Sequence, residues 1–260
     1  MTVASLRYEA AAERQTWMLS TLRSVGFLSV TDLARQLGVS QMTIRRDLHA
    51  LENEGHVRLV HGGASLTPGA PLGSSAPEDD DAEARDRVAA HAVDLVDDTD
   101  TIAIDAGATG HAVARSLPAS FGGCVISHSL PVLQCLSSRR LERVVALGGE
   151  LLAGRHAFVG PTTEAATAQL RVRTFFLTPS GVDARGLYAA SPAEASVQRQ
   201  LMGIADEVVL VVTREVFHTS APARIAPLGR LARLVTDQRP HAELASALRR
   251  VGVVPHVVAG

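Results

Sequence analysis

The sequence VTDLARQLGVSQMTI, residues 30–44, has the spacing of two short helices joined by a tight turn. Leu33 and Leu37 are four residues apart, which places both on one face of the first helix. Gly38 follows where that helix must end, and glycine adopts the left-handed backbone of such a position most easily. The hydroxyl of Ser40 can cap the next helix. The stretch therefore predicts a helix, a sharp turn and a second helix.

The second predicted helix, residues 41–54, has an apolar face and a polar, basic remainder. Ile44, Leu48 and Leu51 recur at i, i+4 and i+7 and form an inward stripe. Polar residues at the start of the second helix are those that meet the major groove in a helix-turn-helix. The residues of this region that we predict to contact DNA are Ser40, Gln41, Thr43, Arg45 and Arg46.

Side-chain chemistry suggests a role for each predicted contact. Arg45 and Arg46 are assigned to phosphate or guanine, because the planar guanidinium donates to two acceptors at once. Gln41 and Thr43 are candidates for base edges. Asp47 is instead expected to pair with a nearby arginine.

Residues 57–60 followed by Gly62 and Gly63 predict a strand and a tight wing turn. His61 and Gly62 of this turn are expected to approach the DNA backbone or minor groove. The alternative is a small helical bundle used for dimerisation. We favour DNA binding, because the glycine turn, the capping serine and the arginine-bearing second helix occur together.

Composition limits the chemistry of this 260-residue chain. All 25 basic residues are arginine, so neither a Schiff-base amine nor a phosphate-loop lysine is available. The net charge is −2 and aromatic residues make up 3%, so DNA binding depends on a local basic surface rather than on a global field or on base stacking. Cys124 and Cys135 lie outside any metal or redox motif, and neither a metal nor a cofactor is predicted. No apolar run reaches the roughly 18 residues of a membrane span, which favours a soluble, cytoplasmic protein.

The rest of the sequence alternates short apolar runs with helical stretches. The runs lie at 101–105, 124–127, 143–147, 174–177, 207–212 and 234–236. This alternation predicts an α/β fold with a largely parallel sheet covered on both faces. Residues 67–82 contain three prolines, two glycines and an acidic run, which is typical of a linker. We therefore predict a DNA-binding domain over 1–66, a linker over 67–82 and an α/β domain over 83–260.

Several of the predicted strands run into loops of small and polar residues. In an open α/β sheet such loops meet at the carboxyl ends of the strands and form one ligand crevice. Their backbone N–H groups and the following helix N-termini favour anions. The competing explanation for any single loop is the steric need for glycine at a strand-to-helix turn. The residues of these loops that we predict to contact an effector are Asp105, Gly107, Thr109, Ser127, His128, Ser129, Gly148, Gly149, Gly181 and Asp183.

The sequence VSQMTIRRDL at 39–48, followed by HGGA at 61–64, resembles the signature of the DeoR family of bacterial transcriptional regulators. The resemblance covers nearly the whole chain. It implies a winged helix-turn-helix that reads an operator. The family usually has arginine where this chain has Leu59, so the neighbouring Arg58 is the candidate for the phosphate contact of the wing. It also implies a sugar-phosphate-sensing domain with a fold similar to that of ribose-phosphate isomerases.

The resemblance extends to the predicted sensor, with departures. Asp105, Gly107 and Thr109 match the family's first loop, and Glu194 keeps its place, which adds it to the candidate effector contacts. In family members a strand near the end of the domain is followed by Asp-x-x-Lys-Phe. This chain has TREVF at 213–217 in that place, so both the aspartate and the lysine are missing. The remaining candidates for a cation that holds an effector phosphate are Arg214, Arg155 and His128. An isomerase would need a proton-transferring carboxylate and such a cation, so the resemblance implies binding without turnover.

Together these observations predict a DNA-binding transcriptional regulator of the cytoplasm. We expect it to act as a homo-oligomer that represses a carbohydrate-use operon and is released by a phosphorylated sugar. The first alternative is a sugar-phosphate isomerase-like enzyme with an incidental helical N-terminal extension. The second is an oligomeric DNA-binding protein whose ligand pocket no longer functions.

Overall fold

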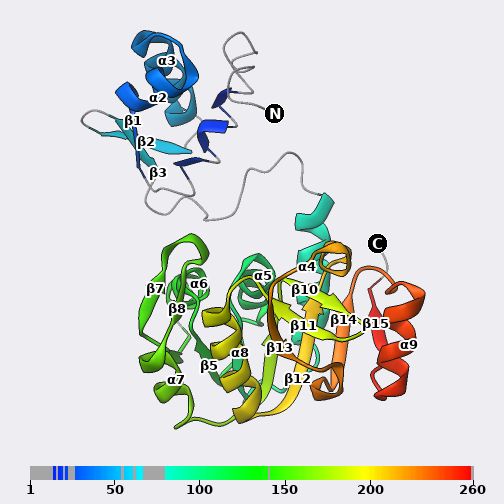
Figure 1. Ribbon diagram of the computed structural model, residues 1–260. Coiled ribbons are helices and arrows are strands. Elements are labelled where there is room, and N and C mark those ends of the chain that lie inside the picture. Colours follow the sequence, from blue (N-terminus) through cyan, green and yellow to red (C-terminus); the bar gives the residue numbers. More distant parts are fainter. Residues whose placement is uncertain are drawn as a thin grey trace. The chain divides into compact units, whose positions relative to one another are not determined.

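The computed structural model describes residues 14–15, 17–19, 21–22, 27–53, 56–60, 63–66, 80–139 and 141–258. The chain divides into two compact units, Met1–Ser74 and Ser75–Gly260, which are described separately below (Figure 1). Most of the predicted linker lies outside the described residues. Helix α4 (Asp80–Val93) begins inside the range predicted for that linker.

The first unit contains the predicted helix pair, α2 (Val30–Leu37) and α3 (Gln41–Asn53). Gly38 between them has a φ of +64°, the left-handed conformation that the sharp turn requires. Three short strands complete the unit. They are β1 (Phe27–Ser29), β2 (Val57–Val60) and β3 (Gly63–Leu66), which form an antiparallel sheet in the order β1-β3-β2.

The predicted apolar stripe forms the core of this unit. Ile44 and Leu48 are fully buried and Leu51 is 2% exposed. They pack with Leu33 and Leu37 of α2 and with apolar residues of the strands in one cluster. The i, i+4, i+7 spacing therefore gave the correct inward face of α3.

The second unit is built on a seven-stranded parallel sheet. Its strand order is β15-β14-β12-β9-β4-β5-β6. The strands are β4 (Thr101–Ile104), β5 (Cys124–Ser127), β6 (Arg143–Ala146), β9 (Val172–Leu177), β12 (Ala205–Val212), β14 (Arg233–Thr236) and β15 (Pro255–Val257). Six of them coincide with the predicted apolar runs, and the parallel sheet confirms the predicted fold class. Strand β15, at one edge, was not predicted.

Helices cover both faces of this sheet, which is why its central strands are apolar on both sides. Phe176 of β9 packs on one face with residues of α4, α5 (Ala108–Ser116) and α6 (Leu130–Ser138). Phe175 packs on the other face with α8 (Pro192–Ile204). Phe175 and Phe176 are adjacent in sequence but pack in the hydrophobic cores on opposite faces of the sheet.

Smaller elements surround the main sheet. They are β7 (Glu150–Leu152), η2 (Ala153–Arg155), β8 (Ala157–Val159), α7 (Pro161–Thr167), β10 (Gly181–Asp183), β11 (Gly186–Ala189), η3 (Arg214–His218), β13 (Ala223–Ala226), η4 (Leu228–Arg230) and α9 (Ala242–Arg250). Strands β10, β11 and β13 form a separate antiparallel sheet, and β7 pairs with β8. Within the described residues, no helix has the length and apolar character needed to cross a membrane.

Candidate nucleic-acid interface and effector site

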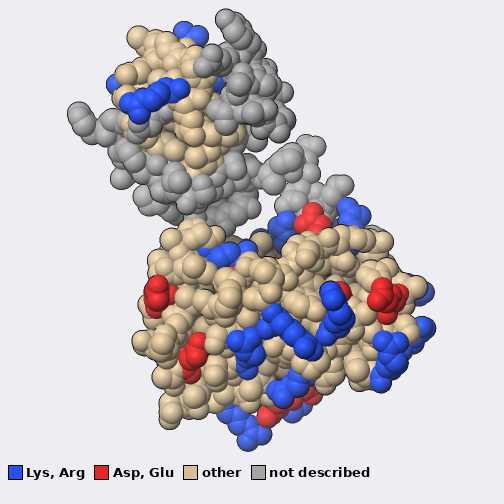
Figure 2. Space-filling view, viewed as in Figure 1, with Lys and Arg blue, Asp and Glu red and all other residues tan. Residues whose placement is uncertain are grey.

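The exposed side of α3 carries two arginines. A helix turns about 100° per residue, so Arg46 points directly away from the stripe of Ile44 and Leu48. Met42, one turn earlier, lies about 40° from that direction, and its side chain is 71% exposed. Arg45 lies on the flank between this side and the stripe, and both arginines are exposed. Neither guanidinium bonds to another described residue, and Figure 2 shows arginine side chains on the visible face of this unit. Both groups are therefore available to an external acceptor.

Met42 was not among the predicted contacts. An apolar side chain in a helix is expected to point inward, and only its position opposite the stripe indicates otherwise. An exposed apolar group at this place can contact a thymine methyl in the major groove.

The first turn of α3 is closed by two hydroxyl groups. The backbone N–H of Thr43 donates to Ser40 Oγ at 3.1 Å, and the two hydroxyl oxygens are 2.9 Å apart. This is the predicted cap. Gln41 has no such role and is exposed.

One of the two acidic residues of α3, Asp47, anchors an arginine that is distant in sequence. Asp47 is 3% exposed. Arg14 donates to its two oxygens, from Nε at 3.0 Å and from Nη2 at 3.3 Å. The prediction that Asp47 pairs with an arginine is confirmed, although the partner is 33 residues away in sequence.

The wing is attached to α3 through a carboxylate. The backbone N–H of Leu59 in β2 donates to Glu52 Oε1 at 2.9 Å. Arg58 lies opposite Ser65 in the β2–β3 pair, and its side chain is outside the described part of the chain. The predicted contacts His61 and Gly62 also lie outside the described residues.

In the second unit, Asp105 is the centre of a buried polar network at the carboxyl end of β4. Its side chain is fully buried. Oδ1 accepts from the backbone N–H of Ala106 at 2.8 Å and faces His128 Nε2 at 3.1 Å. Oδ2 accepts from the backbone N–H of Thr178 at 3.0 Å and from Gln198 Nε2 at 2.8 Å. The network joins the ends of β4, β5 and β9 to helix α8.

His128 connects Asp105 to the segment after η2. The His128 side chain is 1% exposed, and its Nδ1 lies 3.0 Å from the carbonyl oxygen of Phe158. A carbonyl only accepts, so Nδ1 donates to it. The imidazole therefore bridges the Asp105 carboxyl group and the backbone of β8.

Gln198 was missed by the sequence analysis. It lies one helical turn after Glu194 on α8, so the two share a face, and this spacing was the available signal. Gln198 Oε1 and Ser129 Oγ are buried atoms without a hydrogen-bond partner in the described structure. Unpaired buried oxygens are uncommon, and these two lie on residues that adjoin the Asp105 network.

Glu194 is held at the start of α8. Its Oε1 accepts from Arg155 Nε at 2.7 Å, and its Oε2 accepts from the Ser191 hydroxyl at 3.0 Å. The Ser191 oxygen in turn accepts from the Glu194 N–H. This resembles a capping box, and it places Arg155 of η2 beside α8.

Several other predicted effector contacts have structural roles. Ser127 donates to the carbonyl of Ile104 at 2.8 Å and so ties β5 to β4. A side chain on Gly149 would meet Thr163 Oγ1, and one on Gly181 would meet the carbonyl of Thr219. Gly148 accepts a hydrogen bond from Thr163 at 2.9 Å. The competing steric explanation accounts for Gly149 and Gly181, whereas a side chain on Gly148 would meet nothing within 4 Å.

Three more predicted contacts, Gly107, Thr109 and Arg214, make no hydrogen bond with the Asp105 side chain in the described structure. Gly107 has a φ of +110° and is the N-cap of α5, and Thr109 lies in the first turn of that helix. Arg214 is exposed, and its backbone N–H donates to Asp237 at 2.7 Å. Nothing in the described contacts links Arg214 to Asp105.

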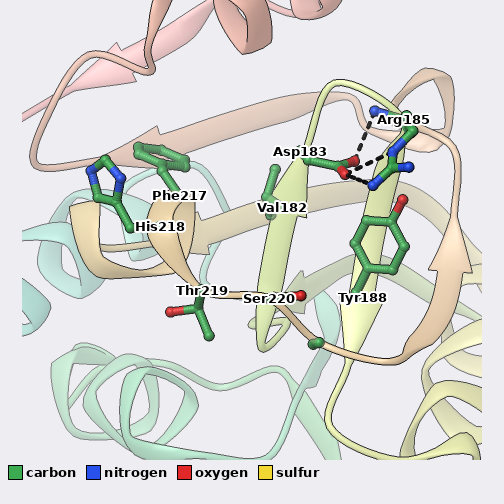
Figure 3. Close-up of a pocket in the computed structure, with 9 residues that line it drawn as sticks. Val182, Asp183, Arg185, Tyr188, Phe217, His218, Thr219 and Ser220 are labelled. Carbon is green, nitrogen blue, oxygen red and sulfur yellow. Dashed lines mark hydrogen bonds and ion pairs between the residues drawn. The ribbon is translucent and has the colours of Figure 1, made fainter.

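Asp183 lines a hollow of about 220 Å³ between the β10–β11 hairpin and the end of η3 with the residues that follow it. Figure 3 shows Asp183, Arg185 and Tyr188 on one wall and Phe217 and His218 on the other. Burial alone would raise the pKa of Asp183, but hydrogen bonds from the backbone and side chain of Arg185 hold it below its ordinary value. The carboxylate therefore stays charged.

His111 lies in α5 and is partly buried. Burial lowers its pKa below the ordinary 6.5, and the positive charge of Arg115 lowers it further, while Asp86 opposes the change. The imidazole is therefore neutral at physiological pH. Among the described residues, no three histidine, cysteine or acidic side chains are placed to hold a metal ion.

Two family models match the chain, and together they cover most of it. Residues 14–68 match the DeoR-like helix-turn-helix domain, and residues 80–238 match the DeoR C terminal sensor domain. The chain therefore belongs to the DeoR family, as its signature motif predicted. It is a DNA-binding transcriptional regulator with a sensor domain.

Relatives of similar length regulate sugar operons. The chain is 29% identical to the lactose phosphotransferase system repressor of Streptococcus mutans, over 86% of this chain and 91% of the relative. It is 27% identical to the L-fucose operon activator of Haemophilus influenzae, over 86% and 91%. Among solved structures, ribose 5 phosphate isomerase A from Neisseria gonorrhoeae is 14% identical, over 52% of this chain and 53% of that one, with a TM-score of 0.39.

Proposed function

We propose that this regulator represses a carbohydrate-use operon and leaves its operator when a phosphorylated sugar binds the sensor unit. The observation that carries the DNA-binding part is the exposed side of α3, where Arg45 and Arg46 have no partner in the described structure. The names of the relatives, a lactose system repressor and an L-fucose operon activator, support a carbohydrate pathway. We place the protein in the cytoplasm, where it reaches its operator.

Two copies of the DNA-binding unit would bind paired half-sites one helical turn of DNA, or a multiple of it, apart. We therefore propose a homo-oligomer. The effector acts through its different affinities for two arrangements of these units, a coupling of about 1–3 kcal/mol.

The sensor binds its ligand without turning it over. A general base needs a carboxylate that is free to take a proton from the substrate. Asp105 is fully buried, and both of its oxygens are already engaged by protein donors. An isomerase is the second candidate, and formation of product from a pentose or hexose phosphate, lost in Asp105→Ala, would support it.

Selection of bound fragments from genomic DNA tests the main proposal. The genes beside the selected operator would identify the pathway. On that operator, Arg46→Ala should weaken binding and lower the salt dependence by about one unit, because one phosphate contact is lost. Arg171→Ala removes an exposed arginine of the sensor unit and is the matched control. Equal affinities and salt slopes for both variants would contradict the assignment.

A further inference from the structure

One guanidinium group beside the buried network is only partly used. Arg155 donates from Nε to Glu194, and the other four N–H groups have no acceptor among the described residues. The Arg155 side chain is 42% exposed, whereas that of Glu194 is 4% exposed. The contact thus has a buried carboxylate on one side and an open guanidinium edge on the other.

The fold fixes Arg155 close to the predicted crevice. It ends η2, just before β8, and β8 contacts the end of β5. Ser129 bridges Ala157, and the N–H of Phe158 donates to the carbonyl of His128 at 2.7 Å. Arg155 is therefore two residues before Ala157, where the chain begins to contact His128 and Ser129. His128 is in turn paired with Asp105.

A second observation at the same place indicates a polar ligand. Ser129 and Gln198 are both more than nine-tenths buried, and each has an oxygen without a partner. Ser129 adjoins β8, and Gln198 follows Glu194 by one turn of α8. A ligand with hydroxyl groups, such as a sugar, would satisfy both oxygens.

We propose that Arg155 binds the phosphoryl group of the effector through its open edge, and that Glu194 is the positioning residue that orients it through Nε. A guanidinium offers two parallel N–H groups to a phosphate. The buried Glu194 carboxylate already holds the Nε side of the guanidinium. The Arg155 side chain therefore loses less conformational entropy when the phosphate binds. This inference rests on the proposed sugar-phosphate sensor.

Titration calorimetry on the full chain tests the inference. The probes are inorganic phosphate and a panel of pentose and hexose phosphates, each compared with its unphosphorylated sugar. Arg155→Gln should weaken the phosphorylated probes roughly 10- to 100-fold, the usual worth of a hydrogen bond to a charged group. It should leave the unphosphorylated sugars unchanged. Arg171→Gln, at an exposed ion pair, is the matched control and should bind every probe as the unaltered protein does.

Two variants of Glu194 separate positioning from folding. Glu194→Gln keeps an oxygen for Arg155 Nε and removes a negative charge, so affinity for the phosphate should be kept or raised. Glu194→Ala removes the support, so affinity should fall. A role limited to folding would lower the melting temperature of these variants and leave the dissociation constants unchanged, which would overturn the inference.

The possible failures are distinguishable. If the unaltered protein binds a phosphorylated probe and Arg155→Gln binds it equally well, the sensor remains and only the role of Arg155 is wrong. If the unaltered protein binds no probe, the proposed effector class is wrong and this inference falls with it.

Discussion

Replacing Asp105 by alanine should lower the stability of the sensor unit much more than replacing an exposed aspartate. The buried carboxyl group of Asp105 is paired with His128 and accepts from two backbone N–H groups and from Gln198. Breaking a buried charge pair from one side costs about 3–5 kcal/mol. Each buried hydrogen-bond donor left without its acceptor lowers the free energy of unfolding by about 1–3 kcal/mol more, and less where water enters and accepts the bond.

We therefore expect a loss of about 4 kcal/mol or more. For a domain of 150–250 residues this corresponds to a fall in melting temperature of roughly 10 °C. Asp206→Ala is the matched control, because Asp206 forms an exposed ion pair with Arg171. Such a pair contributes at most about 1 kcal/mol.

The assay is thermal unfolding of the full chain, followed by circular dichroism and tryptophan fluorescence. Trp17 is the single tryptophan of the sequence and packs against the core of the first unit, so its fluorescence reports that unit alone. Asp105→Ala should shift the circular dichroism transition of the sensor and leave the fluorescence transition in place. Equal shifts for Asp105→Ala and Asp206→Ala would show that the network around Asp105 does not hold the sensor together.

Three further predictions follow from single side chains. Ile44 is fully buried in the first unit, so Ile44→Asp places a charge in its core. The fluorescence transition of Trp17 should disappear while the sensor unit still unfolds cooperatively. A normal fluorescence transition would contradict this. Gly110→Ala places a Cβ 2.2 Å from the carbonyl oxygen of Asp105 and should destabilise the sensor, whereas Gly203→Ala in α8, with nothing within 4 Å, should be neutral or stabilising by up to about 1 kcal/mol. Because the pKa of His111 is lowered on folding, the unfolded chain binds a proton more readily, so this residue makes the sensor less stable as the pH falls below 6.5. His111→Gln should therefore reduce the difference between the melting temperatures at neutral and mildly acidic pH, and an unchanged difference would refute the assignment.

Much of the fold followed from local spacing. The four-residue spacing of Leu33 and Leu37, the left-handed Gly38 and the serine cap identified the helix pair, because these signals depend on neighbours within one or two turns. The apolar runs gave six of the seven parallel strands, because a strand buried on both faces has to be apolar throughout. Strand β15 was missed because its three residues, Pro255–Val257, include a proline and a histidine and so do not form an apolar run.

The candidate site was only partly predictable. Asp105 and His128 were singled out, yet their pairing and the role of Gln198 were not. Conversely, Ser127 and Gly149 have packing roles that explain them without a ligand. A loop sequence shows which groups are near the end of a strand, but whether they meet a ligand or one another depends on the path of the other loops.

The sequence alone determined the class of this protein, since its helix-turn-helix spacing, its TIRRDL motif and its alternating strands and helices are all encoded within short stretches. Tertiary structure decided which distant groups meet. Asp47 pairs with Arg14 across 33 residues, and Asp105 pairs with Gln198 across 93 residues. Such contacts leave no periodic trace in the sequence, because they arise only when separate elements pack and each buried charge needs a partner.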